Sequence, residues 1–159
     1  LHALKASFHT EFETIVVDDG SKDGSAEVAK KFGVKVLELG RNYGPAAARN
    51  EGAAAATAPI VLFIDADVLV RGDTLTRVVD TFSKDPELAA VFGSYDTEPS
   101  APDFLSQYRN LLHHYVHQKS RSDASTFWSG CGAIKRDVFL EMGGFDRVKF
   151  SKPSIEDIE

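Results

Sequence analysis

Short apolar runs alternate with stretches of helical spacing along this chain. Runs rich in β-branched and aliphatic residues predict strands over 13–17, 34–39, 60–64, 88–92 and, interrupted by glycines, 126–135. Apolar positions at helical spacing, or alanine-rich segments, predict helices over 1–7, 25–32, 45–56, 74–82, 104–116 and 137–142. Strand and helix alternate through the first hundred residues. This order predicts one α/β domain over 1–159, with a mostly parallel sheet and helices on both faces.

The apolar run Ile60–Ile64 predicts a strand buried on both faces, and it leads directly into Asp65 and Asp67. Residues two apart in an extended strand point the same way, so both carboxylates share a face if the strand continues that far. Paired carboxylates at the carboxyl end of such a strand are typical of a divalent-metal site. The alternative is that Asp67 caps a turn and Asp65 faces solvent.

Two further polar features lie beside predicted strands. Asp18 and Asp19 end the strand over 13–17, and the carboxyl ends of parallel strands share one edge of a sheet. A carboxylate there can accept hydrogen bonds from a sugar hydroxyl or a base N–H, or simply form a turn. Arg49 lies one turn inside the alanine-rich helix. It either pairs with a phosphate or is an exposed arginine on a helix packed by its alanines.

The segment Trp128–Gly132 places Gly130 and a second glycine within a predicted strand, which indicates a bulge or a close contact with a ligand. Trp128 can stack on a sugar or fill the core. Cys131 has no candidate base beside it, which favours a small buried apolar side chain over a nucleophile.

A histidine group faces away from the apolar stripe of the helix over 104–116. His113 and His117 are spaced i, i+4 and could bind a metal, with His114 beside them. The polar face of a surface helix is the usual meaning of such a pattern.

Composition narrows the function classes. The chain has 159 residues, enough for one core, and its net charge of −6 disfavours a nucleic-acid partner. One cysteine excludes an internal disulfide and fits a reducing compartment, so we expect a place in the cytoplasm or at the cytoplasmic membrane surface. No segment approaches the roughly 20 apolar residues of a membrane span, and no signal peptide is visible.

Taken in order, the motifs resemble those of the family 2 glycosyltransferases, inverting enzymes with the GT-A fold. The matching segments are IVVDDGSKDGS (15–25), GPAAARNEG (44–52), FIDAD (63–67), WSGCGAIKRDVF (128–139), GGFD (143–146) and EDIE (156–159). Each segment alone is a weak signal, whereas their joint order and spacing cover nearly the whole chain.

The resemblance implies a role for each candidate. Asp18 or Asp19, with Asp19 slightly favoured, would contact the nucleoside of a nucleotide-sugar donor. Asp67 would bind Mg²⁺ or Mn²⁺, with Asp65 nearer the ribose and metal-bound water.

The resemblance extends to the transfer step. The Trp128–Gly132 segment would lie near the donor sugar and the acceptor, a saccharide or a lipid-linked molecule. Asp157 would be the general base that takes the proton of the acceptor hydroxyl.

The chain also departs from the family pattern. It starts in the helix that follows the family's first, central strand, and it stops two residues past Asp157. We therefore expect an incomplete GT-A domain with unpaired strand edges, which an oligomer could complete, and little transferase activity from this chain alone. The alternatives are an inactive nucleotide-binding domain and a phosphohydrolase of the haloacid-dehalogenase type, in which the first aspartate of the D-x-D is the nucleophile.

Overall fold

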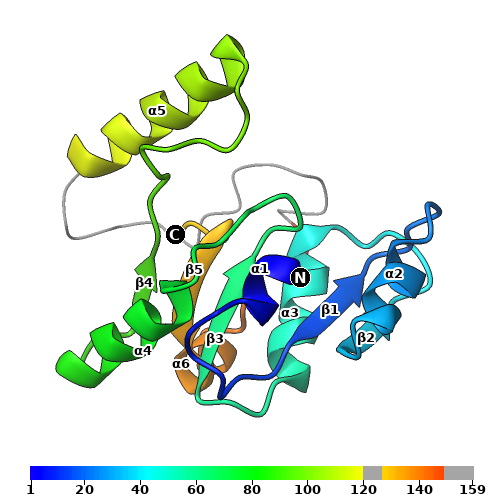
Figure 1. The fold of residues 1–159 in the computed structure, drawn as a ribbon. Helices are drawn as coiled ribbons and strands as arrows, with labels where there is room; N and C mark the ends of the chain where they lie inside the picture. The colour runs from blue at the N-terminus through cyan, green and yellow to red at the C-terminus, as the bar shows by residue number, and fades with distance from the viewer. Residues whose placement is uncertain (120–126, 149–159) are drawn as a thin grey trace.

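The computed structural model describes residues 1–119 and 127–148 (Figure 1). Each element that the hydrophobic pattern predicts is present, and the largest shift of a boundary is at the start of the last strand. The elements are α1 (His2–Lys5), β1 (Ile15–Asp18), α2 (Ser25–Lys31), β2 (Lys35–Glu38), α3 (Pro45–Ala55), β3 (Ile60–Ile64), α4 (Thr74–Lys84), β4 (Ala90–Phe92), α5 (Phe104–Lys119), β5 (Cys131–Lys135) and α6 (Arg136–Glu141).

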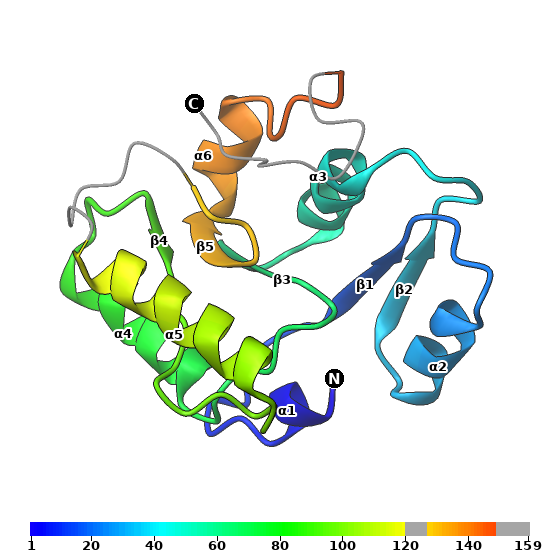
Figure 2. The same ribbon diagram turned by 90° about the horizontal axis from the view of Figure 1, so that it is seen from above.

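The strands form an α/β architecture with one reversed member. β1 and β2 pair in parallel, whereas β5 lies between β3 and β4 and is antiparallel to both. β3 and β4 therefore run in the same direction, and β5 is the exception to the predicted parallel arrangement. The chain reaches β5 from a turn at Ser129–Gly130, so that it enters the sheet from the end where β3 and β4 leave it. Figure 2 shows α3 and α6 on one side of the strands and α2 and α4 on the other.

The sheet is in two pieces. Within residues 1–119 and 127–148, no ladder joins the β1–β2 pair to the β3–β5–β4 sheet. One edge of β1 and one edge of β3 are thus left without a strand partner, as expected from the resemblance. Helix α3 packs along β1 and against α6, so a helix rather than a ladder connects the two pieces (Figure 1).

Aromatic rings and small side chains make the core. The rings of Phe63, Phe139 and Phe145 meet pairwise with centroids 5.2–5.6 Å apart, in tilted or edge-to-face contacts. Ala46 and Ala53, both fully buried, bring α3 close to this cluster. The small side chains of α3 therefore let its backbone approach the sheet.

Helix α5 projects beyond the strands in Figure 1, and it contacts the segment that follows β4. Among the described residues, no helix is both long and apolar enough to cross a bilayer.

Candidate functional site

The end of β3 carries the two aspartates of the D-x-D. The strand stops at Ile64, and the amide of Val68 donates to the carbonyl oxygen of Asp65 at 3.0 Å, which closes a turn. The strand does not continue to Asp67, so strand alternation cannot be the reason for a shared orientation. Asp65 is half-buried and Asp67 is exposed in the turn.

Arg49 of α3 reaches the first of these carboxylates. Its Nη2 lies 2.7 Å from Oδ1 of Asp65, and its side chain is only 16% exposed, against 44% for Asp65. The guanidinium also lies over the ring of Phe145, 5.8 Å from the centroid. Arg49 is therefore not an exposed arginine, and a fixed positive charge lies at the D-x-D turn.

Two neighbours of Arg49, which sequence reasoning did not single out, hold the loop after α6. The buried Asn50 accepts a hydrogen bond from the amide of Phe145 at 2.9 Å and donates one to the carbonyl of Phe145 at 2.8 Å. We refer to this pair of bonds as the Asn50 clamp. Glu51 pairs with Arg147 at 3.0 Å. A buried asparagine among alanines was the available signal, because a buried amide needs partners.

Asp18 and Asp19 accept hydrogen bonds from different loops. Asp18, 8% exposed at the end of β1, accepts a hydrogen bond from the amide of Ser21 at 3.3 Å. Both oxygens of Asp19 accept backbone hydrogen bonds at 2.8 Å, from Tyr43 and Gly44. Asp19 thus fixes the loop that leads into α3, the helix that carries Arg49.

The rings of Trp128 and Tyr95 form a surface next to the D-x-D turn, which we call the aromatic wall. The indole of Trp128 lies 5.3 Å from the ring of Tyr95. Burial raises the pKa of Tyr95, and the negative charges of Asp67 and Asp65 add to the rise. A Cβ on Gly130 would lie 2.8 Å from the indole of Trp128, so the glycine is required for the indole to sit where it does. The amide of Asp65 donates to the carbonyl of Gly130 at 3.0 Å, which connects the wall to the turn.

The histidines of α5 extend this wall. His113 stacks on Tyr95 with centroids 5.0 Å apart, and His117 meets Trp128 edge-on at 5.3 Å. Burial lowers the pKa of His117, and the neighbouring His113 adds to this effect. The face of α5 that the pattern suggests is solvated is therefore the packed one. In the described part of the chain, no cluster of three or more His, Cys, Asp or Glu side chains is arranged to hold a metal ion, and this includes the histidines.

Two remaining candidates have different outcomes. Cys131 is a half-buried free thiol in β5; burial raises its pKa, and the charge of Asp65 adds to the rise, which agrees with an unreactive side chain. Asp157 lies outside the described residues.

The donor atoms at the D-x-D turn fit a hard divalent cation. Mg²⁺ and Mn²⁺ prefer carboxylate oxygens and commonly take only one or two of them, with phosphate oxygens and waters as the other ligands. Asp67 presents an exposed carboxylate, and the carboxylate of Asp65 forms an ion pair with Arg49. The residues present therefore suit a cation that reaches the site together with a phosphate ligand.

Known proteins resemble this chain in sequence and in fold. Glucosyl-dolichyl phosphate glucuronosyltransferase of Haloferax volcanii is 28% identical over 156 residues, which cover 92% of this chain and 50% of that protein. Poly-β-1,6-N-acetyl-D-glucosamine synthase of Staphylococcus epidermidis is 36% identical over 90 residues, 54% of this chain and 22% of the enzyme. The chain thus spans half or less of the length of these curated relatives.

Solved structures share the fold. The mannosyltransferase PcManGT of Pyrobaculum calidifontis, in complex with GDP-Man and Mn²⁺, superposes with a TM-score of 0.69 at 24% identity, covering 96% of this chain and 43% of that one. TarS 1–349 of S. aureus in complex with UDP gives a TM-score of 0.72 at 20% identity, over 94% of this chain and 46% of that one. Residues 1–143 match the family model of glycosyl transferase family 2. The chain belongs to glycosyl transferase family 2.

Proposed function

We propose that this chain forms the donor-binding part of a metal-assisted, inverting glycosyltransferase. The observation that carries the proposal is the ion pair between Arg49 and Asp65 at 2.7 Å, next to the exposed carboxylate of Asp67. A cationic group and a pair of carboxylates side by side suit a diphosphate that arrives with a divalent cation. The PcManGT structure contains GDP-Man and Mn²⁺ and the TarS structure contains UDP, and these ligands belong to the same class.

The donor side of the proposal uses six residues besides Asp67. Asp18, at the end of β1, contacts the nucleoside, and Asp19 positions the 43–44 loop, because both of its oxygens are engaged there. Arg49 and Asp65 lie beside the diphosphate and the ribose. The edge of the aromatic wall at Trp128 and Gly130 faces the sugar, since aromatic rings stack on the apolar faces of sugars.

Asp67, assisted by Asp65, would hold Mg²⁺ or Mn²⁺. When bound, the cation neutralises charge on the diphosphate leaving group. Arg49 orients the Asp65 carboxylate through a charge-assisted hydrogen bond.

The acceptor side rests on the resemblance. Asp157 would take the proton from a hydroxyl of a saccharide or lipid-linked acceptor. The acceptor oxygen attacks the anomeric carbon on the side opposite the diphosphate, the bond from that carbon to the diphosphate breaks, and the configuration inverts. One cysteine fits a reducing compartment, so we place the reaction in the cytoplasm or on the cytoplasmic face of a membrane.

Calorimetry with UDP and GDP, each with and without Mn²⁺, tests the proposal. We expect the metal to strengthen binding of at least one nucleotide diphosphate and Asp67→Asn to remove that gain. Asp80→Asn, an exposed carboxylate on α4, is the matched control and should bind as the unchanged chain does. Equal affinity with and without Mn²⁺, or an undiminished gain in Asp67→Asn, contradicts the proposal.

The same experiment tests one alternative function, and the order of the strands argues against the other. Metal-independent nucleotide binding would indicate a nucleotide-binding domain without transferase chemistry. The phosphohydrolase alternative puts its D-x-D after the first strand of the domain, whereas here β1 and β2 precede β3, and the family match argues against it as well.

A further inference from the structure

Helix α5 is amphipathic but oriented opposite to an ordinary surface helix. Its least exposed positions are the polar ones: Ser106, Asn110, His114 and His117. A surface helix of a globular protein normally turns its apolar stripe toward the core and its polar face to water. The inner face of α5, defined by these four residues, is packed instead.

Three polar side chains attach α5 to the segment 94–96. Asn110 donates to the carbonyl of Asp96 at 2.5 Å, Nδ1 of His114 lies 2.5 Å from the carbonyl of Tyr95, and Gln118 donates to the hydroxyl of Ser94 at 3.3 Å. Successive positions four residues apart on the helix thus meet successive residues of the 94–96 segment. Repeated pairing of this kind fixes the rotation of α5, so the outward orientation of its stripe is built into the fold.

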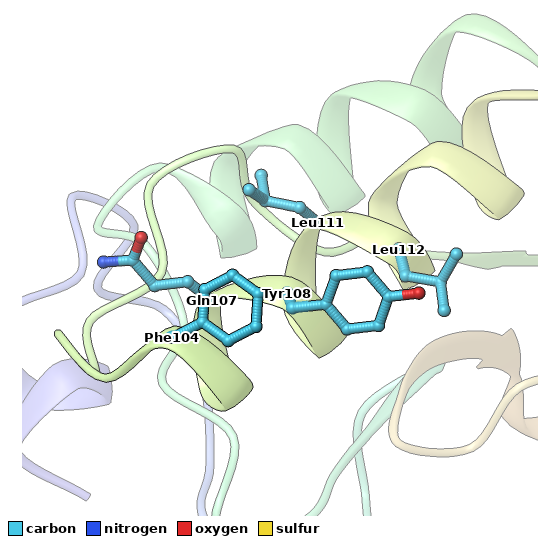
Figure 3. Close-up of a pocket in the computed structure, with 5 residues that line it drawn as sticks. All are labelled: Phe104, Gln107, Tyr108, Leu111 and Leu112. Atoms are coloured by element: carbon cyan, nitrogen blue, oxygen red, sulfur yellow. The ribbon is translucent and has the colours of Figure 1, made fainter.

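The outer face of α5 is large, apolar and rich in aromatic residues. Phe104 is 83% exposed and Tyr115 is 60% exposed. Figure 3 shows Phe104, Tyr108 and Leu112 projecting along the helix around a shallow hollow. The outer face consists of Phe104, Leu105, Tyr108, Leu111, Leu112, Tyr115 and Val116. Contiguous exposed apolar surface of this kind marks a binding face.

Charge indicates what this face binds. α5 contains no Asp or Glu, although the chain as a whole has a net charge of −6. Its two permanent cations, Arg109 and Lys119, are exposed and sit at the edge and the end of the outer face by helical spacing. An apolar stripe with aromatic rings, bordered by basic side chains that can extend to headgroups, is the pattern of a helix lying in a membrane interface.

We propose that the outer face of α5 docks on an anionic lipid bilayer. The apolar side chains enter the boundary between headgroups and acyl chains, and Arg109 and Lys119 contact the lipid phosphates. A second copy of this chain is the competing occupant, and light scattering separates the two.

Docking would place the D-x-D turn near the lipid surface. His114 of the inner face contacts the carbonyl of Tyr95, and the ring of Tyr95 contacts Trp128. Two residues after Trp128, the carbonyl of Gly130 accepts a hydrogen bond from the amide of Asp65. The same helix would then contact lipid on one side and the aromatic wall on the other. This inference stands on the exposed stripe and its charge, so it does not depend on the proposed sugar transfer.

Vesicle co-sedimentation of the 159-residue chain tests the proposal. We expect binding to vesicles of phosphatidylcholine with phosphatidylglycerol. Binding to phosphatidylcholine alone should be about 25-fold weaker, since each of two basic residues contributes about fivefold near an anionic surface. The triple variant Leu105→Ser, Tyr108→Ser, Leu112→Ser should lose binding. The matched control replaces three exposed apolar residues elsewhere: Val28, Leu69 and Met142, each by serine.

A charge variant separates the two contributions. Arg109→Glu with Lys119→Glu should weaken binding to anionic vesicles and leave binding to neutral ones nearly unchanged. Lys31→Glu with Lys84→Glu, two exposed lysines on α2 and α4, makes the same change of net charge away from α5 and should bind as the unchanged chain does.

A fluorophore that senses the polarity of its surroundings tests insertion of the outer face directly, without the triple substitution that could prevent folding. Attached at Leu112→Cys in a Cys131→Ala background, it should shift to the blue on vesicles and be quenched by spin-labelled lipid. The same probe at Val28→Cys should not respond.

Four outcomes overturn the proposal. They are no binding of the unchanged chain, equal loss in the two triple variants, equal binding to neutral and anionic vesicles, and a dimer in light scattering that only the outer-face triple variant disrupts. The last result would assign the face to a second copy of the chain.

Discussion

Asn50→Ala should be among the most damaging single substitutions on α3. Asn50 and Phe145 are both buried, and the replacement removes both hydrogen bonds of the Asn50 clamp. It leaves the amide and the carbonyl of Phe145 without those partners, at about 1–3 kcal/mol for each buried group. The expected loss is therefore about 2–6 kcal/mol in the free energy of unfolding, a large part of the roughly 5–15 kcal/mol that holds a domain together.

Urea denaturation followed by circular dichroism measures this loss, and a thermal scan should show a midpoint lower by about 6–12 °C for a loss of about 3 kcal/mol. Glu51→Ala is the matched control. It removes the adjacent contact between α3 and the same loop, an ion pair whose side chains are 43% and 54% exposed, and should cost less than about 1 kcal/mol. Alanine improves helix propensity more when it replaces Asn than when it replaces Glu, so propensity works against the expected difference and cannot produce it. Equal unfolding midpoints for the two variants would refute the assignment of the clamp.

Three other substitutions test separate parts of the fold. Gly144→Ala should cost more than Gly24→Ala: both glycines have positive φ, 70° and 82°, which alone costs about 1–2 kcal/mol, but only at Gly144 would the Cβ meet another side chain, 2.5 Å from the clamp oxygen. Matched urea curves would show the difference. Hydrogen bonds from the amide and hydroxyl of Thr57 lower the pKa of Glu13, so this tie stabilises the fold above the carboxyl's unfolded pKa and is lost as pH falls below about 4. Glu13→Gln should therefore flatten the acid limb of stability against pH, and an unchanged limb contradicts the reasoning. Gly130→Ala should displace the indole of the one tryptophan and shift its emission, with circular dichroism unchanged.

Sequence reasoning located the elements but not their directions or orientations. The run Ile60–Ile64 is apolar enough to be a strand in any fold, and its limits were predicted correctly. β5 gives the same kind of signal, yet it runs antiparallel, because side-chain pattern reports burial and not strand direction. α5 shows the same gap: its stripe predicted the helix, but helical spacing does not say which face finds a partner inside the molecule.

The sequence identified site residues of opposite charge on neighbouring predicted elements. Arg49 and Asp65 were both candidates, and the structure pairs them. Asp19 was a candidate for the ligand, and its oxygens turn out to hold backbone amides, a contact that depends on where a distant loop lies. Asn50 was passed over for the same reason, since its partner is 95 residues away.

Three consecutive residues of α3 make contacts in three directions. Arg49 reaches the D-x-D turn, Asn50 the backbone of Phe145, and Glu51 the side chain of Arg147. Neighbouring residues on a helix project about 100° apart, so each contact depends on the phase of the helix. Inserting or deleting one residue before position 49 would rotate all three away from their partners at once. Length variation among related chains should therefore be confined to the loops on either side of α3.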